Sequence, residues 1–264
     1  MTPAWQGGHV TSRATCVLAP NPGALTLEGT NTWVLVEPGS SQCVVVDPGP
    51  LDEQHLRRVL DVVELRGARV CLTLLTHGHP DHAESGARFG ELTGAPVRAI
   101  GVGHDGLGDG DRLTVDGLDL AVVATPGHTS DSLSFLLAAE NALLTGDTIL
   151  GRGTAMVAWP DGELAAYLAS LQRIEAMTGS GEVTQILPGH GPTVQDAAGV
   201  VRYYLDHRSE RLEQVRAAIT HSGGDLGADV DGLVETVYAD VPRELWPAAR
   251  LSVLAQLDYL RAQS

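Results

Sequence analysis

A short segment rich in histidine and aspartate constrains this chain more than any other feature. Residues 76 to 86 read THGHPDHAESG, and within six positions they contain His77, His79, Asp81 and His82. Imidazole nitrogens and carboxylate oxygens occur at this density mainly where they hold a metal ion. The segment follows a nearly continuous apolar run, RVCLTLL at 69–75, which indicates a strand buried on both faces. The pattern therefore predicts a metal site in the loop that ends a buried strand.

The order of these ligands within the loop predicts two neighbouring metal positions. An extended chain places His77 and His79 on the same side, and Asp81 and His82 follow as the chain turns. We expect Pro80 to prevent a helix from starting at that point. Each pair supplies only two ligands, and a metal shell needs four or five, so the remaining ligands must come from elsewhere in the chain.

Three further residues share a local pattern in which a polar residue follows an apolar strand and a glycine. They are His128 in ATPGHTSDS, Asp147 in LLTGDTILG and His190 in ILPGHGPTV. Loops at strand ends are held by a rigid scaffold and can direct such side chains to one point. We therefore predict that the first metal is held by His77, His79 and His128. The second is held by Asp81, His82 and His190, and Asp147 bridges both.

A bridging carboxylate defines the chemistry expected of this pair. It brings two cations to about 3.5–4 Å, the separation found in two-metal hydrolases. A water shared by the cations loses its proton near neutral pH, and the resulting metal-bridging hydroxide is the expected nucleophile toward a carbonyl carbon or phosphorus. Because no cysteine belongs to the set, an open catalytic site is favoured over a structural one, with Asp81 and Asp147 in catalytic roles. Zinc is the expected metal, and iron or manganese accept the same ligands.

The rest of the sequence predicts an α/β layered fold followed by a helical module. Short apolar runs separated by turns indicate strands at 32–37, 42–47, 97–100, 132–137, 142–145 and 184–187, and a hairpin at 111–125 that turns at Asp116-Gly117. Helical spacing of apolar residues occurs at 55–65, 82–92 and 163–177, and again in the tail at 200–219, 233–238 and 251–260. We expect a catalytic domain at 1–197 and a C-terminal module at 198–264.

Composition bears on location and partners. The formal net charge is −16 and the 17 basic residues are all arginine, so the surface repels phosphate backbones at long range, and stable binding to duplex DNA is not expected. No apolar segment approaches the roughly 20 residues of a membrane helix, and the first residues lack the pattern of a secretory signal. With three scattered cysteines, a reducing cytoplasm is the expected location, without membrane association.

Taken in order, the motifs THGHPDH, PGHT, GDT and PGHGP resemble those of the metallo-β-lactamase superfamily. The resemblance covers the chain to about residue 195 and implies an αββα sandwich with two metals, typically zinc, at one edge. The secreted antibiotic-degrading branch typically has a cysteine in place of Asp147, so degradation of β-lactams is not expected. The interval from Asp147 to His190 is too short for the extra domain of the long-insert nucleases.

A closer resemblance extends nearly end to end. NPGALTLEGTNTWVL, GDTILGRGT and YYLDHRSERLEQV look like the β-lactamase-like endoribonuclease subgroup, whose mitochondrial members cut single-stranded RNA. It implies that the tail is a winged-helix-like module and that Asn31 faces the metals from a strand end. Arg152, in the flexible segment after Asp147, is expected to form a lip of the cleft and to meet a phosphate or carboxylate of the substrate.

These observations support one leading function and two alternatives. The leading prediction is a phosphodiesterase that acts as an endoribonuclease on single-stranded RNA. The second is a thioesterase or other acyl hydrolase of glyoxalase II type that acts on a small metabolite, which fits the acidic surface more easily. The third is a binding module, a metal-holding fold whose helical tail contacts nucleic acid without chemistry. The other histidines are expected to be solvated, namely His9, His55, His104, His207 and His221.

Overall fold

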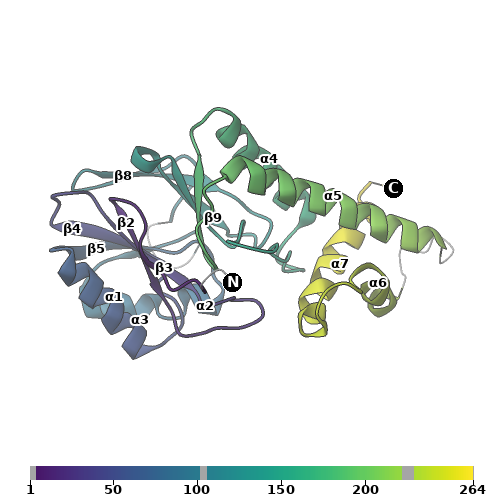
Figure 1. Cartoon of the computed structure of the whole chain (residues 1–264), viewed down its shortest axis with the longest axis horizontal. Helices are drawn as coiled ribbons and strands as arrows, with labels where there is room; N and C mark the ends of the chain where they lie inside the picture. Colours follow the sequence, from purple (N-terminus) through teal and green to yellow (C-terminus); the bar gives the residue numbers. More distant parts are fainter. Residues whose placement is uncertain (1–3, 102–105, 222–228, 264) are drawn as a thin grey trace.

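Two β-sheets packed face to face form the centre of the molecule, and helices cover both outer faces (Figure 1). The structure is a computed structural model, and it describes residues 4–101, 106–221 and 229–263. His104 lies outside these residues. No helix in the described part of the chain is long and apolar enough to cross a membrane.

The first sheet has six strands in the order β1-β2-β3-β4-β5-β6. They are β1 (Gly8–His9), β2 (Ala14–Leu18), β3 (Asn31–Val36), β4 (Gln42–Val46), β5 (Arg69–Leu74) and β6 (Val97–Arg98). The pairs from β1 to β4 are antiparallel, whereas β5 and β6 continue parallel to β4. The carboxyl ends of β4 and β5 therefore meet at one edge, where the histidine-rich segment begins.

The second sheet has five strands in the order β11-β10-β9-β8-β7. They are β7 (Arg112–Val115), β8 (Leu118–Ala124), β9 (Leu133–Leu137), β10 (Ala142–Gly146) and β11 (Gln185–Pro188). The pairs from β7 to β10 are antiparallel, and β11 is parallel to β10. As a result, β8, β10 and β11 run in the same direction and end at the same edge.

Alternation of side chains along the strands explains the layers. In β3, Trp33 and Leu35 point between the sheets and pack with residues such as Phe135 of β9. Val34 and Val36 point to the other side, where they pack against the helices α1 (Glu53–Leu65) and α3 (Gly86–Thr93). A strand covered on both faces reads as a continuous apolar run, as the sequence of β3 does.

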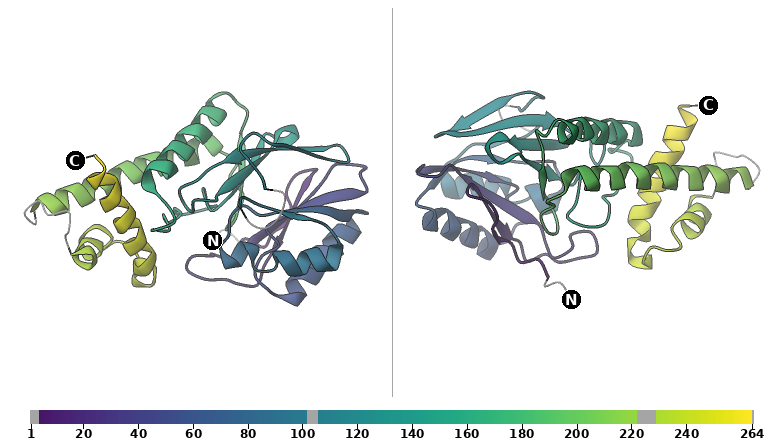
Figure 2. Two further views of the ribbon diagram at one scale, coloured as in Figure 1. Left: turned by 180° about the vertical axis from the view of Figure 1, so that it is seen from behind. Right: turned by 45° about the horizontal axis from the view of Figure 1, so that its top comes forward.

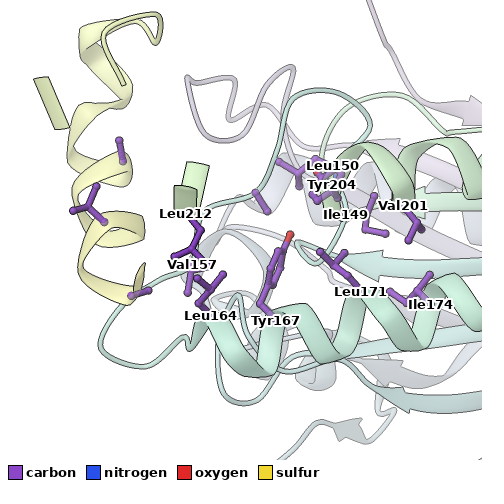
Figure 3. Packing of buried hydrophobic residues seen from close by; sticks show 14 of the residues in the cluster. Ile149, Leu150, Val157, Leu164, Tyr167, Leu171, Ile174, Val201, Tyr204 and Leu212 are labelled. Atoms are coloured by element: carbon purple, nitrogen blue, oxygen red, sulfur yellow. The ribbon is translucent and has the colours of Figure 1, made fainter. Parts of the chain in front are cut away.

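The second sheet is covered in the same way by α4 (Leu164–Gly179) and the first part of α5 (Ala197–His221). Tyr167 and Leu171 of α4 and Tyr204 of α5 pack in one buried cluster with residues of the sheet (Figure 3). The order of the layers is helices, sheet, sheet, helices. The predicted αββα sandwich is thereby confirmed.

The C-terminal part of the chain is helical and shares this buried cluster. It consists of the second part of α5, α6 (Val230–Val237), a 3₁₀ turn at Arg243–Leu245 and α7 (Trp246–Arg261). Figure 2 shows α5 running from the layer of α4 outward to α6 and α7. Val253 and Leu257 of α7 belong to the same cluster as Leu164 of α4, so the tail packs on the sandwich through apolar contacts. The boundary expected between residues 197 and 198 falls within α5 and stays a prediction.

Several local expectations need correction. Pro80 does not prevent a helix but is the first residue of the short α2 (Pro80–Ala83). Proline is favourable there because the backbone N–H of the first helical residue has no partner within the helix. The single helix expected at 82–92 is divided into α2 and α3. His55 is not solvated but fully buried, with its Nε2 2.8 Å from Thr32 Oγ1. The strands β1 and β2 were not predicted, since their apolar runs are short.

Candidate metal centre

The seven predicted ligands gather at one open end of the sandwich, because the strands that precede them end there. His77 to His82 follow β5, His128 follows β8, Asp147 follows β10 and His190 follows β11. Their ligand atoms form three groups in which all atoms lie within 4.8 Å of one another: His77, His79 and His128; His77, His82 and Asp147; and Asp81, His82 and His190. The first and third groups contain the same residues as the two predicted triads.

Asp147 lies between the two triads. Its Oδ1 is 3.4 Å from His82 Nε2 and 3.4 Å from His190 Nε2. Its Oδ2 is 3.7 Å from His128 Nε2 in the first triad. The two oxygens thus face different groups of nitrogens, as a bridging carboxylate requires.

Glycine brings the loops close enough to form these groups. Gly127 precedes His128 with φ +136, and a Cβ at this position would lie 2.2 Å from Tyr167 Cα. Gly189 precedes His190, and a Cβ there would lie 2.6 Å from Asp147 Oδ1. A side chain at either position would collide with the scaffold or with a ligand. The recurring Pro-Gly-His sequence therefore reflects a packing requirement of the site.

The unpaired atoms in the cluster fit bound cations. Within the described residues, His77 Nε2 and Asp147 Oδ1 are buried without a hydrogen-bond partner, and leaving such a group unsatisfied costs about 1–3 kcal/mol. The ring nitrogens of His79 and His128 face each other at 3.1 Å, and those of His82 and His190 at 3.2 Å. Cations bound within each triad would satisfy these nitrogen and oxygen atoms.

Hydrogen bonds on the far side of three of the rings direct their Nε2 atoms inward. Three Nδ1 atoms donate to protein oxygens: His82 to Asp47 Oδ2 at 2.8 Å, His128 to the Met156 carbonyl at 2.8 Å, and His190 to the Gly29 carbonyl at 3.2 Å. Such partners fix both the orientation and the tautomer of a ligating histidine. In the neutral ring the inward nitrogen is then left as the acceptor, the form in which imidazole binds a metal.

Sequence reasoning missed Asp47, which organises the second triad from behind. Besides His82, this buried carboxylate accepts hydrogen bonds from the Thr76 backbone N–H at 2.8 Å and from Thr76 Oγ1 at 2.7 Å. The Thr76 oxygen in turn lies 3.0 Å from His77 Nδ1. A signal was present, because VVVDPG shows a polar residue after an apolar strand and beside Pro-Gly, as the ligand loops do.

We predict that Asp47→Asn weakens metal binding about 10- to 100-fold, the usual effect of losing a carboxylate behind a metal-bound histidine. Asparagine tolerates the positive φ of 52 at this position, so the fold should be retained. Competition with a chromogenic chelator measures the affinity, with the exposed Glu91→Gln as the control. An affinity equal to that of the control would show that Asp47 does not support the site.

The charges of the centre are strongly coupled. Burial lowers the pKa of His77 well below its usual value, and the neighbouring His82 adds to this effect. Burial alone would also lower the pKa of His82, but the carboxylates of Asp147 and Asp47 raise it well above the usual value. Against the effect of burial, His190 and His82 hold the pKa of Asp147 well below its usual value. Cations and protons therefore compete for the same atoms, and metal binding is expected to release protons.

A cleft of about 460 Å³ opens over the ligands. Its floor includes His79, Asp81 and His190, and its walls come from the loop at 24–27 and from the C-terminal helices. Apolar side chains dominate these walls, among them Leu25, Leu27, Leu150, Met156, Val241 and Leu245. The sandwich and the C-terminal helices thus line a mostly apolar cleft beside the polar metal centre. Small-molecule sites commonly combine apolar walls with a few polar groups in this way.

The two predicted substrate contacts differ in position. Asn31 is fully buried, and its amide donates to the Pro188 and Gly191 carbonyls while its Oδ1 accepts from Trp5 Nε1. It therefore holds the loop of His190 and does not face the cleft, which corrects the expectation. Arg152 does line the cleft, with its side chain 50% exposed and its Nη1 2.7 Å from Glu28 Oε1. Its contact with substrate stays a prediction.

The αββα fold, with His/Asp clusters at the open end of its sheets, defines a metal-dependent hydrolase. The chain belongs to the metallo-beta-lactamase superfamily, whose family model matches residues 25–111 and 100–190. A second family, the beta-lactamase associated winged helix domain, matches residues 230–263. The predicted winged-helix-like tail is thereby confirmed.

Similar proteins match this chain over most of its length. The chain is 33% identical to the beta-lactamase-like protein 2 homolog of Drosophila melanogaster, covering 97% of this chain and 90% of that protein. It is 31% identical to a lactamase-like protein of Penicillium aethiopicum, covering 94% and 81%. The structure of a metallo-beta-lactamase family protein from Thermus thermophilus aligns with a TM-score of 0.77 at 24% identity, covering 96% and 94%. A beta-lactamase domain protein from Burkholderia ambifaria aligns with a TM-score of 0.78 at 22% identity, covering 97% and 88%.

Proposed function

We propose that this chain is a two-zinc hydrolase that cleaves a carboxylic ester or thioester with an apolar acyl group. The observation that carries this proposal is the cleft, which is small, mostly apolar and placed directly over the ligand clusters. An acyl chain would bury apolar surface against Leu25, Leu150 and Leu245 while its carbonyl lay at the polar centre.

Each ligand has a role in this proposal. His77, His79 and His128 would hold one cation, and Asp81, His82 and His190 the other, with Asp147 shared. Bound there, the cations supply an acidified water and a positive charge beside the substrate oxygen. Asp81 lines the cleft with its side chain 28% exposed, so its carboxylate is available to exchange a proton with the reacting water. With an acyl chain in place, the apolar walls would exclude other water and so strengthen these interactions.

Cleavage of single-stranded RNA, the function implied by the sequence resemblance, is the second candidate. The winged helix domain beside the cleft supports it. The charges of the cleft favour it less, because phosphate contacts require accessible cations. Arg152, which lines the cleft, is paired with Glu28. The net charge of −16 also opposes an approaching polyanion.

A comparison of the two substrates tests the proposal. Metal-loaded protein is offered thioesters of increasing acyl length and, separately, labelled single-stranded RNA, with Asp81→Ala and His190→Ala as controls for contaminating enzymes. We expect thioester turnover that rises with acyl length and disappears in both variants, while RNA is cut no faster than by the variants. RNA cleavage by the native protein alone, with the thioesters left intact, would instead establish the second candidate.

A further inference from the structure

A buried arginine lies in the wall of the cleft where the C-terminal part of the chain meets the sandwich. Arg208 belongs to α5, lines the same cleft as Asp81, Asp147 and His190, and is 3% exposed. It contributes nothing to the chemistry described above. A guanidinium is charged at all accessible pH values, and burying it is costly unless an anion or several hydrogen bonds compensate.

The partners of Arg208 are neutral. Its Nη2 donates to the Ala155 carbonyl, and its guanidinium lies over the Tyr167 ring at 5.0 Å from the centroid. In the part of the chain that the structure describes, no carboxylate lies within ion-pair distance of Arg208, and its Nε has no hydrogen-bond partner. The positive charge beside the cleft is therefore only partly compensated by the protein itself.

His207, the preceding residue, adds a second unsatisfied group. It lines the cleft as well, and its Nδ1 is buried without a hydrogen-bond partner among the described residues. Burial, followed by the charges of Arg208 and Arg211, lowers its pKa to about 4, so the ring is neutral and carries one N–H donor. Asp240, the carboxylate that faces this region, is bound to Arg211 Nη2 at 2.7 and 3.0 Å. The expectation of a solvated His207 is thus corrected.

We propose that Arg208, assisted by His207, binds a carboxylate carried by the acyl part of the substrate. This inference rests on the proposed acyl hydrolase function and names its substrate class: an acyl ester or thioester with an apolar chain that ends in an acidic group. The metal centre would take the reacting carbonyl and Arg208 the distal anion. A guanidinium fork suits this role, since it holds a carboxylate through two parallel hydrogen bonds.

Two thioesters of equal chain length test the inference. Pentanoyl and glutaryl thioesters of N-acetylcysteamine differ at the far end of the acyl chain, which is a methyl group in the first and a carboxylate in the second. We expect the metal-loaded native protein to prefer the glutaryl thioester by about 10- to 100-fold in kcat/KM, as a charge-assisted hydrogen bond gives. In Arg208→Gln the ratio should fall to about one, and in Arg208→Lys to an intermediate value.

Controls separate binding from structure. Arg202→Gln changes an exposed arginine of the same helix and should keep the native preference. His207→Gln should reduce the preference by about three- to tenfold. If Arg208→Gln does not fold, inhibition of the native protein gives the same information, and free glutarate should inhibit pentanoyl turnover at least tenfold more strongly than free pentanoate.

The outcomes are distinct. Equal turnover of both thioesters by the native protein would overturn the carboxylate site and leave the acyl hydrolase function standing. Turnover of neither would overturn the proposed function and the substrate class together. Cleavage of RNA that is lost in Arg208→Gln would assign the arginine to a phosphate and contradict the inference.

Discussion

Replacing Asp147 with alanine is expected to lower kcat/KM about a thousandfold, or roughly 4 kcal/mol of transition-state stabilisation. The reason is its position between the two triads, where Oδ1 faces His82 and His190 and Oδ2 faces His128. Loss of this one side chain removes a ligand from both metal positions, whereas loss of any one histidine affects mainly one triad.

Steady-state hydrolysis of the best thioester measures this effect, together with the metal content of the purified variant. Asp61→Ala, which changes an exposed carboxylate on α1, provides the control and should retain native activity. A variant of Asp147 that kept two bound metals and more than about a tenth of the activity would rule out the bridging role.

Removal of the metals is expected to destabilise the fold by about 4 kcal/mol, the linkage term for a ligand present at a thousand times its dissociation constant. The physical cause is the crowded cluster itself, in which His77 Nε2 and Asp147 Oδ1 lack partners in the described residues and two pairs of ring nitrogens face each other at 3.1 and 3.2 Å. For a chain of this size the melting temperature should fall by about 10 °C.

Thermal melts before and after dialysis against a chelator measure this difference, and re-addition of zinc should restore the higher value. Asp147→Ala serves as a matched control, since it should already melt at a lower temperature and respond less to the chelator. Identical melting curves for the treated and untreated native protein would mean that metal binding contributes nothing to its stability.

Sequence patterns predicted the ligand loops because these depend on local rules. The strand before His77 is an uninterrupted apolar run, and His128 and His190 follow Pro-Gly at the ends of similar runs. Strands of the two packed sheets that end on the same side of the sandwich bring such loops together. The alternation of strands and helices likewise indicated a layered α/β fold, whereas the αββα order of the layers was implied by the resemblance of the motifs to the metallo-β-lactamase superfamily.

Features that depend on long-range packing were not predictable. Asp47 shares the strand-end pattern of the ligand loops, but only the folded chain shows that it lies behind His82 and is not a ligand itself. His55 and His207 lie on helices whose periodicity gave no sign that the first ring would be fully buried and the second partly buried beside the cleft. The tail helices were visible as separate amphipathic segments, but their placement as a wall of the cleft follows from contacts between α4, α5 and α7.

The central claim is that seven side chains from four loops hold two metal ions at the open end of the sandwich. Anomalous X-ray scattering from crystals of the zinc-loaded protein tests it most directly. We predict two peaks about 3.5–4 Å apart, one beside His77, His79 and His128, the other beside Asp81, His82 and His190, with Asp147 between them. A crystal soaked in zinc that showed no peak among these side chains would contradict the account.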